Sequence, residues 1–194
     1  MESKKNTPSF HAKTRAEWRK WLEKNHAKET VMWLIIYHKS AKTPSVYYAE
    51  AVEEALCFGW IDSLANKHDE NSIYLSFYPR KPKSNWSKLN RERVERLTKE
   101  GLMAPAGQAM VDLAKQTGTW DAMVDIENGV IPPDLQKLFD GNKTAFDNFN
   151  AFAPSSRKLI LKWIQDAKRP ETRQKRIEET VNLAAKNIKA NHPK

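Results

Sequence analysis

The sequence predicts an α+β fold: a small, mostly antiparallel sheet with helices in the order α-β-α-β-β-α, followed by an all-helical C-terminal module. Short β-branched and aromatic runs alternate with segments of helical apolar spacing in residues 1–105, whereas residues 106–194 show helical spacing alone. A composition of 40% hydrophobic residues, with seven tryptophans, provides a buried core for a chain of 194 residues. We therefore expect an α+β domain at 1–105 and a helical module at 106–194.

The first three elements follow from capping residues and apolar spacing. Thr14 and Glu17 form a capping box, which predicts the first helix. Residues 31–38, VMWLIIYH, are β-branched and aromatic and too short for an exposed helix, so we expect a central strand. Apolar residues recur at helical spacing from Tyr48, and Gly59 suits the left-handed turn that ends a helix.

A hairpin and another helix should complete the N-terminal domain. Residues 60–64 and 72–78 predict two antiparallel strands, and period-two spacing places Ile73, Leu75 and Phe77 on one face. Prolines 79 and 82 end the second strand. The next helix is expected at 86–100, ended by Gly101 and capped by Ser84, Asn85 or Ser87.

The C-terminal module should consist of helices, several of which begin at proline, where the missing amide costs nothing. The predicted ranges are 106–116, 133–139, 142–152, 154–167 and 170–191. In the last two helices one apolar face is expected to be buried, comprising Trp163, Ile164, Ile177, Val181, Ala184 and Ile188.

Positive charge is concentrated in two segments of a chain whose net charge is +9. Residues 79–99 contain eight Lys or Arg against two acids, and residues 157–176 contain the same numbers, so each segment carries +6. The remainder of the chain is therefore net acidic. Such polarised charge is typical of a protein that meets an anionic partner, although solvated helix faces with local ion pairs are the alternative.

Most catalytic signatures are missing from the sequence. There is no G-x-G-x-x-G, no phosphate-binding P-loop and no G-x-S-x-G elbow, and five scattered histidines form no metal-ligand pattern. We expect neither a metal nor a cofactor. The single cysteine, Cys57, lies near a predicted helix C-terminus, where the helix dipole disfavours a thiolate, so we interpret it as a buried apolar residue.

A small-ligand site is the first candidate for function. Trp60 and Asp62 should lie on the same face of a strand. If that face meets the start of the next helix, a small ligand could be held by Trp60, Asp62, Arg80, Ser84, Asn85 and Trp86. Alternatively, both tryptophans belong to the core, and Asp62 caps a turn or pairs with Arg80.

An anion-binding surface is the second candidate. Spacings of four and three place Arg169, Arg173 and Arg176 on one helical face, where all three are expected to point outward. Tryptophans beside lysines add aromatic surfaces on which bases can stack. The residues expected to contact the anion are Lys81, Lys83, Lys88, Arg91, Arg93, Arg96, Arg169, Arg173 and Arg176.

Four motifs resemble the bacterial YdeI/OmpD-associated family, whose members are described as bacteriocin-protection proteins. They are ALCFGWIDS at 55–63, KSNWSKLNRERVERL at 83–97, GLMAPAG at 101–107 and WIQDAKRPETRQKRIEETV at 163–181. The resemblance implies a separable helical module at about 133–190 and a role in stress or in protection against antimicrobial agents.

These observations predict a cytoplasmic, non-enzymatic binding protein. Its partner would be nucleic acid or a phosphorylated small molecule, bound through the basic segments. The N-terminus has no export signal and no run is long enough to be a transmembrane segment, which underlies the expected location. Two alternatives remain open: a small enzyme or ligand sensor that uses the Trp/Asp/Arg pocket, and a protein–protein adaptor in envelope stress.

Overall fold

The computed structural model describes residues 8–191 and confirms the α+β class, with an N-terminal part of sheet and helices and a helical C-terminal part. The chain divides into two compact units, Met1–Ala122 and Met123–Lys194. Each unit has a hydrophobic core of its own. The boundary thus lies at 122/123, later in the chain than the expected 105/106.

The N-terminal unit is built on a four-stranded sheet. Its strands are β1 (Ser9–His11), β2 (Met32–Tyr37), β3 (Trp60–Lys67) and β4 (Ser72–Pro79), in the spatial order β1-β2-β4-β3. β1 is parallel to β2, and the other neighbours are antiparallel. The predicted central strand and hairpin are therefore confirmed, whereas β1 was not predicted, because three residues are too few to show a period.

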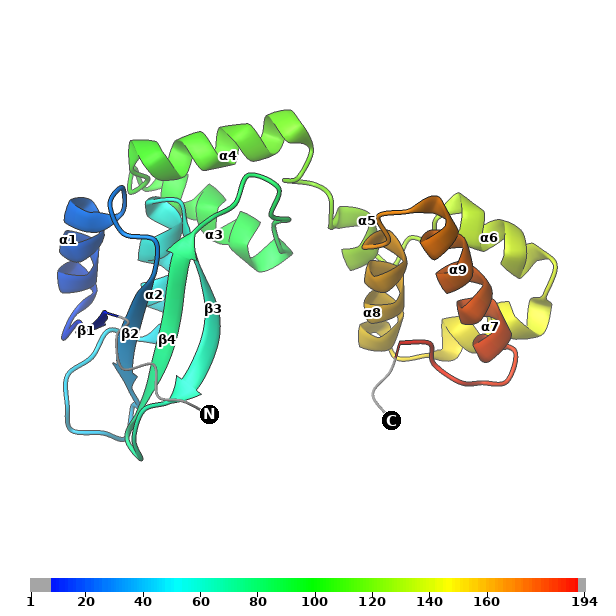
Figure 1. Cartoon of the computed structure of the whole chain (residues 1–194), viewed down its shortest axis with the longest axis horizontal. Coiled ribbons are helices and arrows are strands. Elements are labelled where there is room, and N and C mark those ends of the chain that lie inside the picture. Colours follow the sequence, from blue (N-terminus) through cyan, green and yellow to red (C-terminus); the bar gives the residue numbers. More distant parts are fainter. Residues whose placement is uncertain (1–7, 192–194) are drawn as a thin grey trace. The chain divides into compact units, whose positions relative to one another are not determined.

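Helices cover one face of this sheet. They are α1 (Arg15–Asn25), α2 (Tyr48–Cys57) and α3 (Lys88–Lys99), and in Figure 1 α2 lies behind the strands. Cross-strand pairs Leu34↔Leu75 and Met32↔Phe77 supply the buried sheet residues of this core. The predicted alternation in β4 is thereby confirmed.

The fourth helix, α4 (Pro105–Thr117), packs closely against the end of α2. The backbone amide of Ala104 donates to the carbonyl of Cys57 at 3.0 Å. A Cβ added to Gly107 would lie 2.2 Å from the same carbonyl oxygen, so only glycine fits there. Val111 and Ala114 belong to the N-terminal core. Because α4 completes this core, the unit extends to residue 122.

The C-terminal unit is helical throughout its described part. It comprises α5 (Val124–Glu127), α6 (Pro133–Asp140), α7 (Lys143–Ala151), α8 (Pro154–Gln165) and α9 (Pro170–Ala184). All except α5 were predicted, and prolines at the first turns of α6, α8 and α9 occupy positions where an amide is not needed. Phenylalanines of α6 and α7 pack against each other in the core, with ring centroids of Phe139 and Phe149 5.1 Å apart and their planes tilted by 42°.

The last helix is shorter than predicted. Ile177, Val181 and Ala184 are buried as expected, but Ile188 is 50% exposed. α9 ends at Ala184, and Asn187 adopts a positive φ of 55°, which turns the chain away before Ile188 can join the apolar face. The prediction of a buried Ile188 is therefore wrong.

Candidate functional site

The segment that carries the predicted ligand site joins β4 to α3. β4 ends at Pro79, and α3 follows its N-cap residue Ser87, whose Oγ accepts a hydrogen bond from the amide of Asn90 at 3.4 Å. In between, the amide of Ser84 donates to the carbonyl of Lys81 at 2.9 Å and closes a turn. The basic loop thus leads into a helix N-terminus, where amide groups favour anions.

Arg80 lies beneath this loop and is 6% exposed. Its guanidinium stacks on the Trp86 ring with 3.6 Å from Cζ to the ring centroid, and Nη2 donates to the carbonyl of Asn85 at 2.6 Å. Nε and Nη1 are shielded from solvent and have no hydrogen-bond partner among residues 8–191. Burial lowers the pKa of Arg80 to about 10, opposed by the charge of Asp62, so the side chain still carries its charge at neutral pH.

Asp62 lies near Arg80 but is hydrogen-bonded elsewhere. Its Oδ2 accepts a hydrogen bond from the Tyr48 hydroxyl at 2.8 Å, at the start of α2. Burial, followed by this bond to the carboxylate, raises the pKa of Tyr48, whereas the positive charge of Arg93 opposes the shift. The structure therefore brings charged and polar groups close together from β3 (Asp62), the loop after β4 (Arg80), α2 (Tyr48) and α3 (Arg93).

The other members of the predicted pocket divide between core and surface. Trp60 is 1% exposed, and its indole N–H donates to the carbonyl of His26 at 3.1 Å, at the end of α1. Its side chain therefore belongs to the core, as in the alternative interpretation. Trp86 is also buried, but it forms one wall of the Arg80 site. Ser84 is half-buried and Asn85 is exposed.

The cations of residues 79–99 are only partly available to a partner. Arg91 donates to the carbonyl of Trp86 at 2.7 Å, and Arg93 donates to Asn90 Oδ1 at 3.1 Å. Arg96 pairs with Glu53 and with Glu100, and Lys88, although 72% exposed, lies 3.9 Å from Glu92. Three side chains of this segment are exposed and form no ion pair within the described residues, namely Lys81, Lys83 and Lys99. Lys81 and Lys83 lie in the loop before α3, whereas Lys99 is the last residue of α3.

Arg169, Arg173 and Arg176 were expected to point outward from α9. This expectation is wrong for Arg173 and Arg176, which have partners within the unit. Arg173 pairs with Asp134 of α6 through two hydrogen bonds, from Nε at 2.6 Å and Nη2 at 2.9 Å. Arg176 stacks on Trp163 and donates to its carbonyl oxygen. Arg169, the N-cap residue of α9, is exposed. Spacing placed these residues on one face, but neighbouring helices supply partners that α9 alone cannot reveal.

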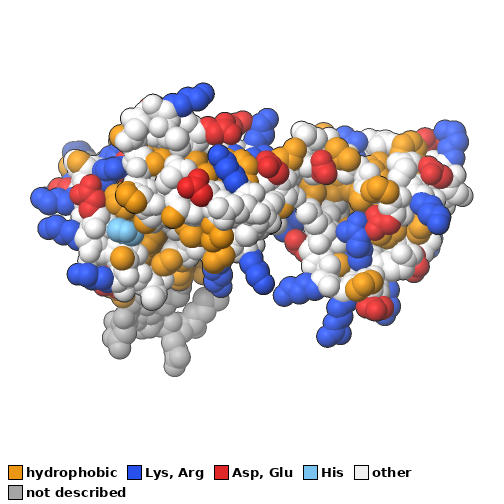
Figure 2. Space-filling model, turned by 90° about the horizontal axis from the view of Figure 1, so that it is seen from above, with side chains coloured by type: hydrophobic (Ala, Val, Ile, Leu, Met, Phe, Trp, Pro, Cys, Tyr) orange, Lys and Arg blue, Asp and Glu red, His pale blue; other side chains and the backbone are white. Residues whose placement is uncertain are grey.

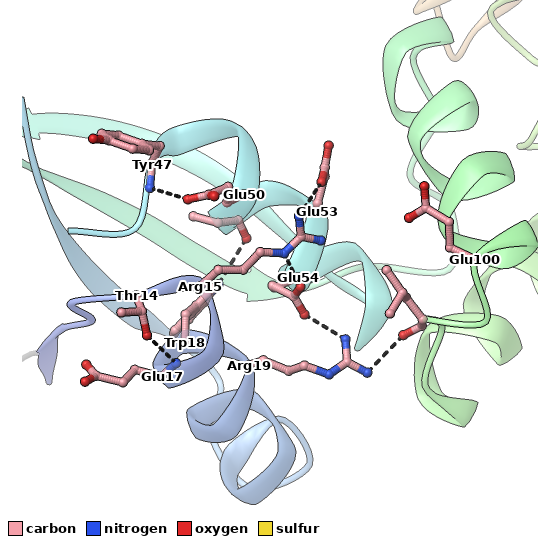
Figure 3. Close-up of polar contacts among 12 residues, drawn as sticks. Thr14, Arg15, Glu17, Trp18, Arg19, Tyr47, Glu50, Glu53, Glu54 and Glu100 are labelled. Carbon is pink, nitrogen blue, oxygen red and sulfur yellow. Dashed lines mark hydrogen bonds and ion pairs between the residues drawn. The ribbon is translucent and has the colours of Figure 1, made fainter. Parts of the chain in front are cut away.

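A buried charge network between α1 and α2 was not predicted (Figure 3). Glu54 is 2% exposed and accepts hydrogen bonds from Arg15 Nε at 2.6 Å and Arg19 Nη1 at 2.8 Å. Arg15 also pairs with Glu53 at 3.1 Å. Both carboxylate oxygens of Glu54 are occupied, so the network joins two helices and leaves little capacity for a ligand. The available signal was Glu54 beside apolar Ala51 and Ala55.

Cys57 adjoins this network and is buried as a free thiol. Burial, reinforced by the charge of Glu54, raises its pKa to about 11, which keeps it protonated at neutral pH. A protonated, buried thiol is a poor nucleophile, in agreement with its interpretation as a core residue.

Figure 2 shows how charge is distributed on one face of each unit. Lys and Arg side chains lie among acidic and hydrophobic ones and do not form one continuous basic surface on either unit in this view.

Within residues 8–191 no three His, Cys, Asp or Glu side chains are grouped as metal ligands. None of the helices in the same range has the length and apolar character needed to span a bilayer.

Comparison with protein families accounts for both units. A family model described as "Domain of unknown function (DUF8412)" matches residues 10–110, which is more than half of the chain. The chain belongs to this family. The DUF8412 match contains α1–α3, the sheet except for Ser9 of β1, and the Arg80 site. It also contains the motifs at 55–63, 83–97 and 101–107, which were described above as resembling the YdeI/OmpD-associated family.

A second family model, "Bacteriocin-protection, YdeI or OmpD-Associated", matches residues 128–187. The expected membership in the YdeI/OmpD-associated family is thus confirmed for the C-terminal unit, which follows the DUF8412 domain. No curated protein and no solved structure matches the chain.

Proposed function

We propose that this protein is a non-enzymatic binding protein for an anionic partner that carries phosphate groups, either nucleic acid or a phosphorylated ligand. The contact surface is the loop between β4 and α3 together with the start of α3. One observation carries the proposal: Lys81 and Lys83, which are exposed and form no ion pair within residues 8–191, directly follow the buried Arg80, which has unused hydrogen-bond donors. No acidic residue occurs between 79 and 91 to neutralise them.

The second basic segment has a smaller part in this proposal. Arg173 and Arg176 are already bound within the YdeI/OmpD-associated unit, and Lys162 pairs with Asp166. The exposed cations of this segment without an ion pair among residues 8–191 are Lys158, Lys168, Arg169 and Lys175. Ion pairs with acidic neighbours reduce the attraction that a side chain can offer to another anion. We therefore assign the partner to the DUF8412 domain.

The cytoplasm is the compartment that we propose for this activity. The thiol of Cys57 is unpaired, as is usual in a reducing compartment. Phosphate-bearing partners, both nucleic acids and phosphorylated metabolites, are abundant there.

Fluorescence anisotropy with labelled oligonucleotides tests the proposal. For a nucleic-acid partner, log affinity should fall linearly with log salt, by about 0.7 per phosphate contact on single strands or about 0.9 on duplexes. Inorganic pyrophosphate should compete if a small phosphorylated ligand is the natural partner. The double variant Lys81→Gln, Lys83→Gln should bind more weakly and with a smaller salt slope.

A matched control comes from the other basic segment. Lys168→Gln with Lys175→Gln removes the same charge from the C-terminal unit and should leave the affinity almost unchanged. The proposal is contradicted if neither oligonucleotide nor pyrophosphate binds at low salt, or if the control pair weakens binding as much as the loop pair.

Protection against bacteriocins is a second candidate function, favoured by the description of the family that matches residues 128–187. Expression of the full chain in a bacteriocin-sensitive bacterium should then raise survival at a fixed bacteriocin dose. An equal dose response with and without the protein would remove this candidate.

A further inference from the structure

Two charged side chains are buried in the described part of the chain, and only one of them is neutralised. Glu54 contacts two arginines, whereas Arg80 forms no ion pair within residues 8–191. An unpaired buried charge is costly, because it loses its hydration without gaining a counter-ion. The position of Arg80 therefore requires an explanation that its neighbours in the fold do not supply.

The Arg80 guanidinium is held in place but not saturated. The Trp86 ring supports one face at 3.6 Å, and the carbonyl of Asn85 accepts from Nη2. Asp62 is the acidic residue whose charge acts on Arg80, but its carboxylate accepts a hydrogen bond from Tyr48 and none from Arg80. A guanidinium group that is held in one orientation and has unused N–H donors at Nε and Nη1 is well suited to bind an oxyanion.

The surroundings favour a doubly charged oxyanion over a carboxylate. Three cationic residues, Arg80, Lys81 and Lys83, occur within four consecutive positions, and α3 begins directly after the loop with its positive dipole end. A terminal phosphate group matches this excess of positive charge, and its several oxygens can accept from more than one donor.

We propose that Arg80 is the binding site for the terminal phosphate group of a small ligand, with Trp86 as the wall that orients the guanidinium. This inference rests on the proposed function and makes it more specific. Since Nε and Nη1 are shielded from solvent, the phosphate reaches them only when the loop at residues 81–85 shifts, while Trp86 stays against the guanidinium.

NMR spectroscopy of the full chain tests the proposal through the Nε–H signal of Arg80, assigned by its loss in Arg80→Met. Inorganic phosphate should shift this signal saturably, and chloride at equal ionic strength should not. Absence of any shift with millimolar phosphate would overturn the proposal. So would a shift that occurs with an oligonucleotide lacking a terminal phosphate but not with inorganic phosphate.

Thermal unfolding gives a second readout. Phosphate should raise the Tm of the wild type, because a ligand that binds only the folded state stabilises it. Without phosphate, Arg80→Met should fold with an unchanged or higher Tm, since an apolar side chain replaces an unpaired charge, and phosphate should no longer raise it. A variant that unfolds at all temperatures would mark Arg80 as structural and overturn the proposal.

The matched control is Arg96→Met, which alters an arginine of α3 that pairs with Glu53 and Glu100. It should keep the full response of Tm to phosphate. Failure of this inference can be told apart from failure of the proposed function. If oligonucleotides bind through Lys81 and Lys83 while the Arg80 signal is unmoved, only the inference fails; if nothing binds, both fail.

Discussion

At the scale of single residues, the buried carboxylate of Glu54 shows how charge stabilises this fold. It joins Arg15 and Arg19 of α1 to α2, and its side chain is 3% exposed, whereas the arginines are about a third exposed. Loss of the carboxylate would leave two positive side chains close together, offset only by the more exposed pairs of Arg15 with Glu53 and of Arg19 with Glu23.

We therefore expect Glu54→Gln to lower the free energy of unfolding by about 3 kcal/mol, at the low end for a buried pair because the arginines remain partly hydrated. Urea unfolding followed by circular dichroism measures this. Glu23→Gln is the control, since Glu23 also pairs with Arg19 but is 53% exposed, and it should change stability by less than about 0.5 kcal/mol. Equal effects would mean that the burial of Glu54 is unimportant.

The pair between Asp134 and Arg173 should make the C-terminal unit sensitive to acid. The hydrogen bonds from Arg173, and then its charge, hold the pKa of Asp134 below its usual value. A depressed folded-state pKa means that the pair stabilises above the unfolded carboxyl's pKa, and that this stabilisation is lost as pH falls through the folded-state value.

Asp134→Asn should therefore be less stable than wild type at pH 6, and in chemical denaturation the difference should begin to shrink once the pH falls below about 4 and continue to shrink through the folded-state pKa of Asp134. Arg173→Ala should reproduce this pattern, contrary to the expectation from sequence that Arg173 points outward. A difference that is independent of pH would show that the ion pair contributes nothing.

At the scale of elements, the contact between α2 and α4 depends on one missing side chain. Gly107 lies against the carbonyl of Cys57, where a Cβ would be 2.2 Å from oxygen. In an ordinary helix Gly→Ala is stabilising, but here the added methyl group must push two helices apart.

Gly107→Ala should accordingly destabilise the N-terminal unit by about 1–3 kcal/mol. The control is Gly141→Ala, where the nearest atom to a Cβ lies at 3.6 Å and φ is negative, so stability should stay the same or rise slightly. The measurement is the midpoint of urea unfolding. A stabilised Gly107→Ala would mean that α4 is free to move away.

At the scale of the whole molecule, the two separate cores predict two unfolding events. Ile177→Ala truncates a side chain that is 1% exposed in the C-terminal core, and it should lower the transition of that unit alone, by about 2–4 kcal/mol. Tryptophan fluorescence and calorimetry together can resolve the two transitions. Ile188→Ala, at a half-exposed position, is the control and should shift neither. Equal shifts of both transitions would show that the units unfold as one.

Local patterns in the sequence were sufficient for most of the fold. Thr14 accepts from the amide of Glu17, Gly59 has a φ of 73°, and prolines begin three helices of the C-terminal unit. Caps, turns and apolar periods act over a few neighbouring residues, so they can be recognised in the chain itself. The elements without such a signal, β1 and α5, are the short ones.

Local sequence patterns could not predict which residues form ion pairs or hydrogen bonds with the charged side chains. From sequence, Arg80 and Arg173 both belong to basic segments, yet Arg173 binds a carboxylate of α6 while Arg80 is buried beside a tryptophan without one. A charge pattern along the chain states how much charge there is, but not which residues distant in sequence neutralise it.

The sequence by itself therefore determined the class of the fold, the order and type of its longer elements, and the location of its two basic segments. Only the tertiary structure decided which cations remain available, that α4 belongs to the first unit, and that Glu54 joins α1 to α2. The physical reason is the separation along the sequence of the residues that interact. Backbone conformation and amphipathic spacing depend on residues within a few positions, whereas burial and ion pairing depend on side chains that only folding brings together.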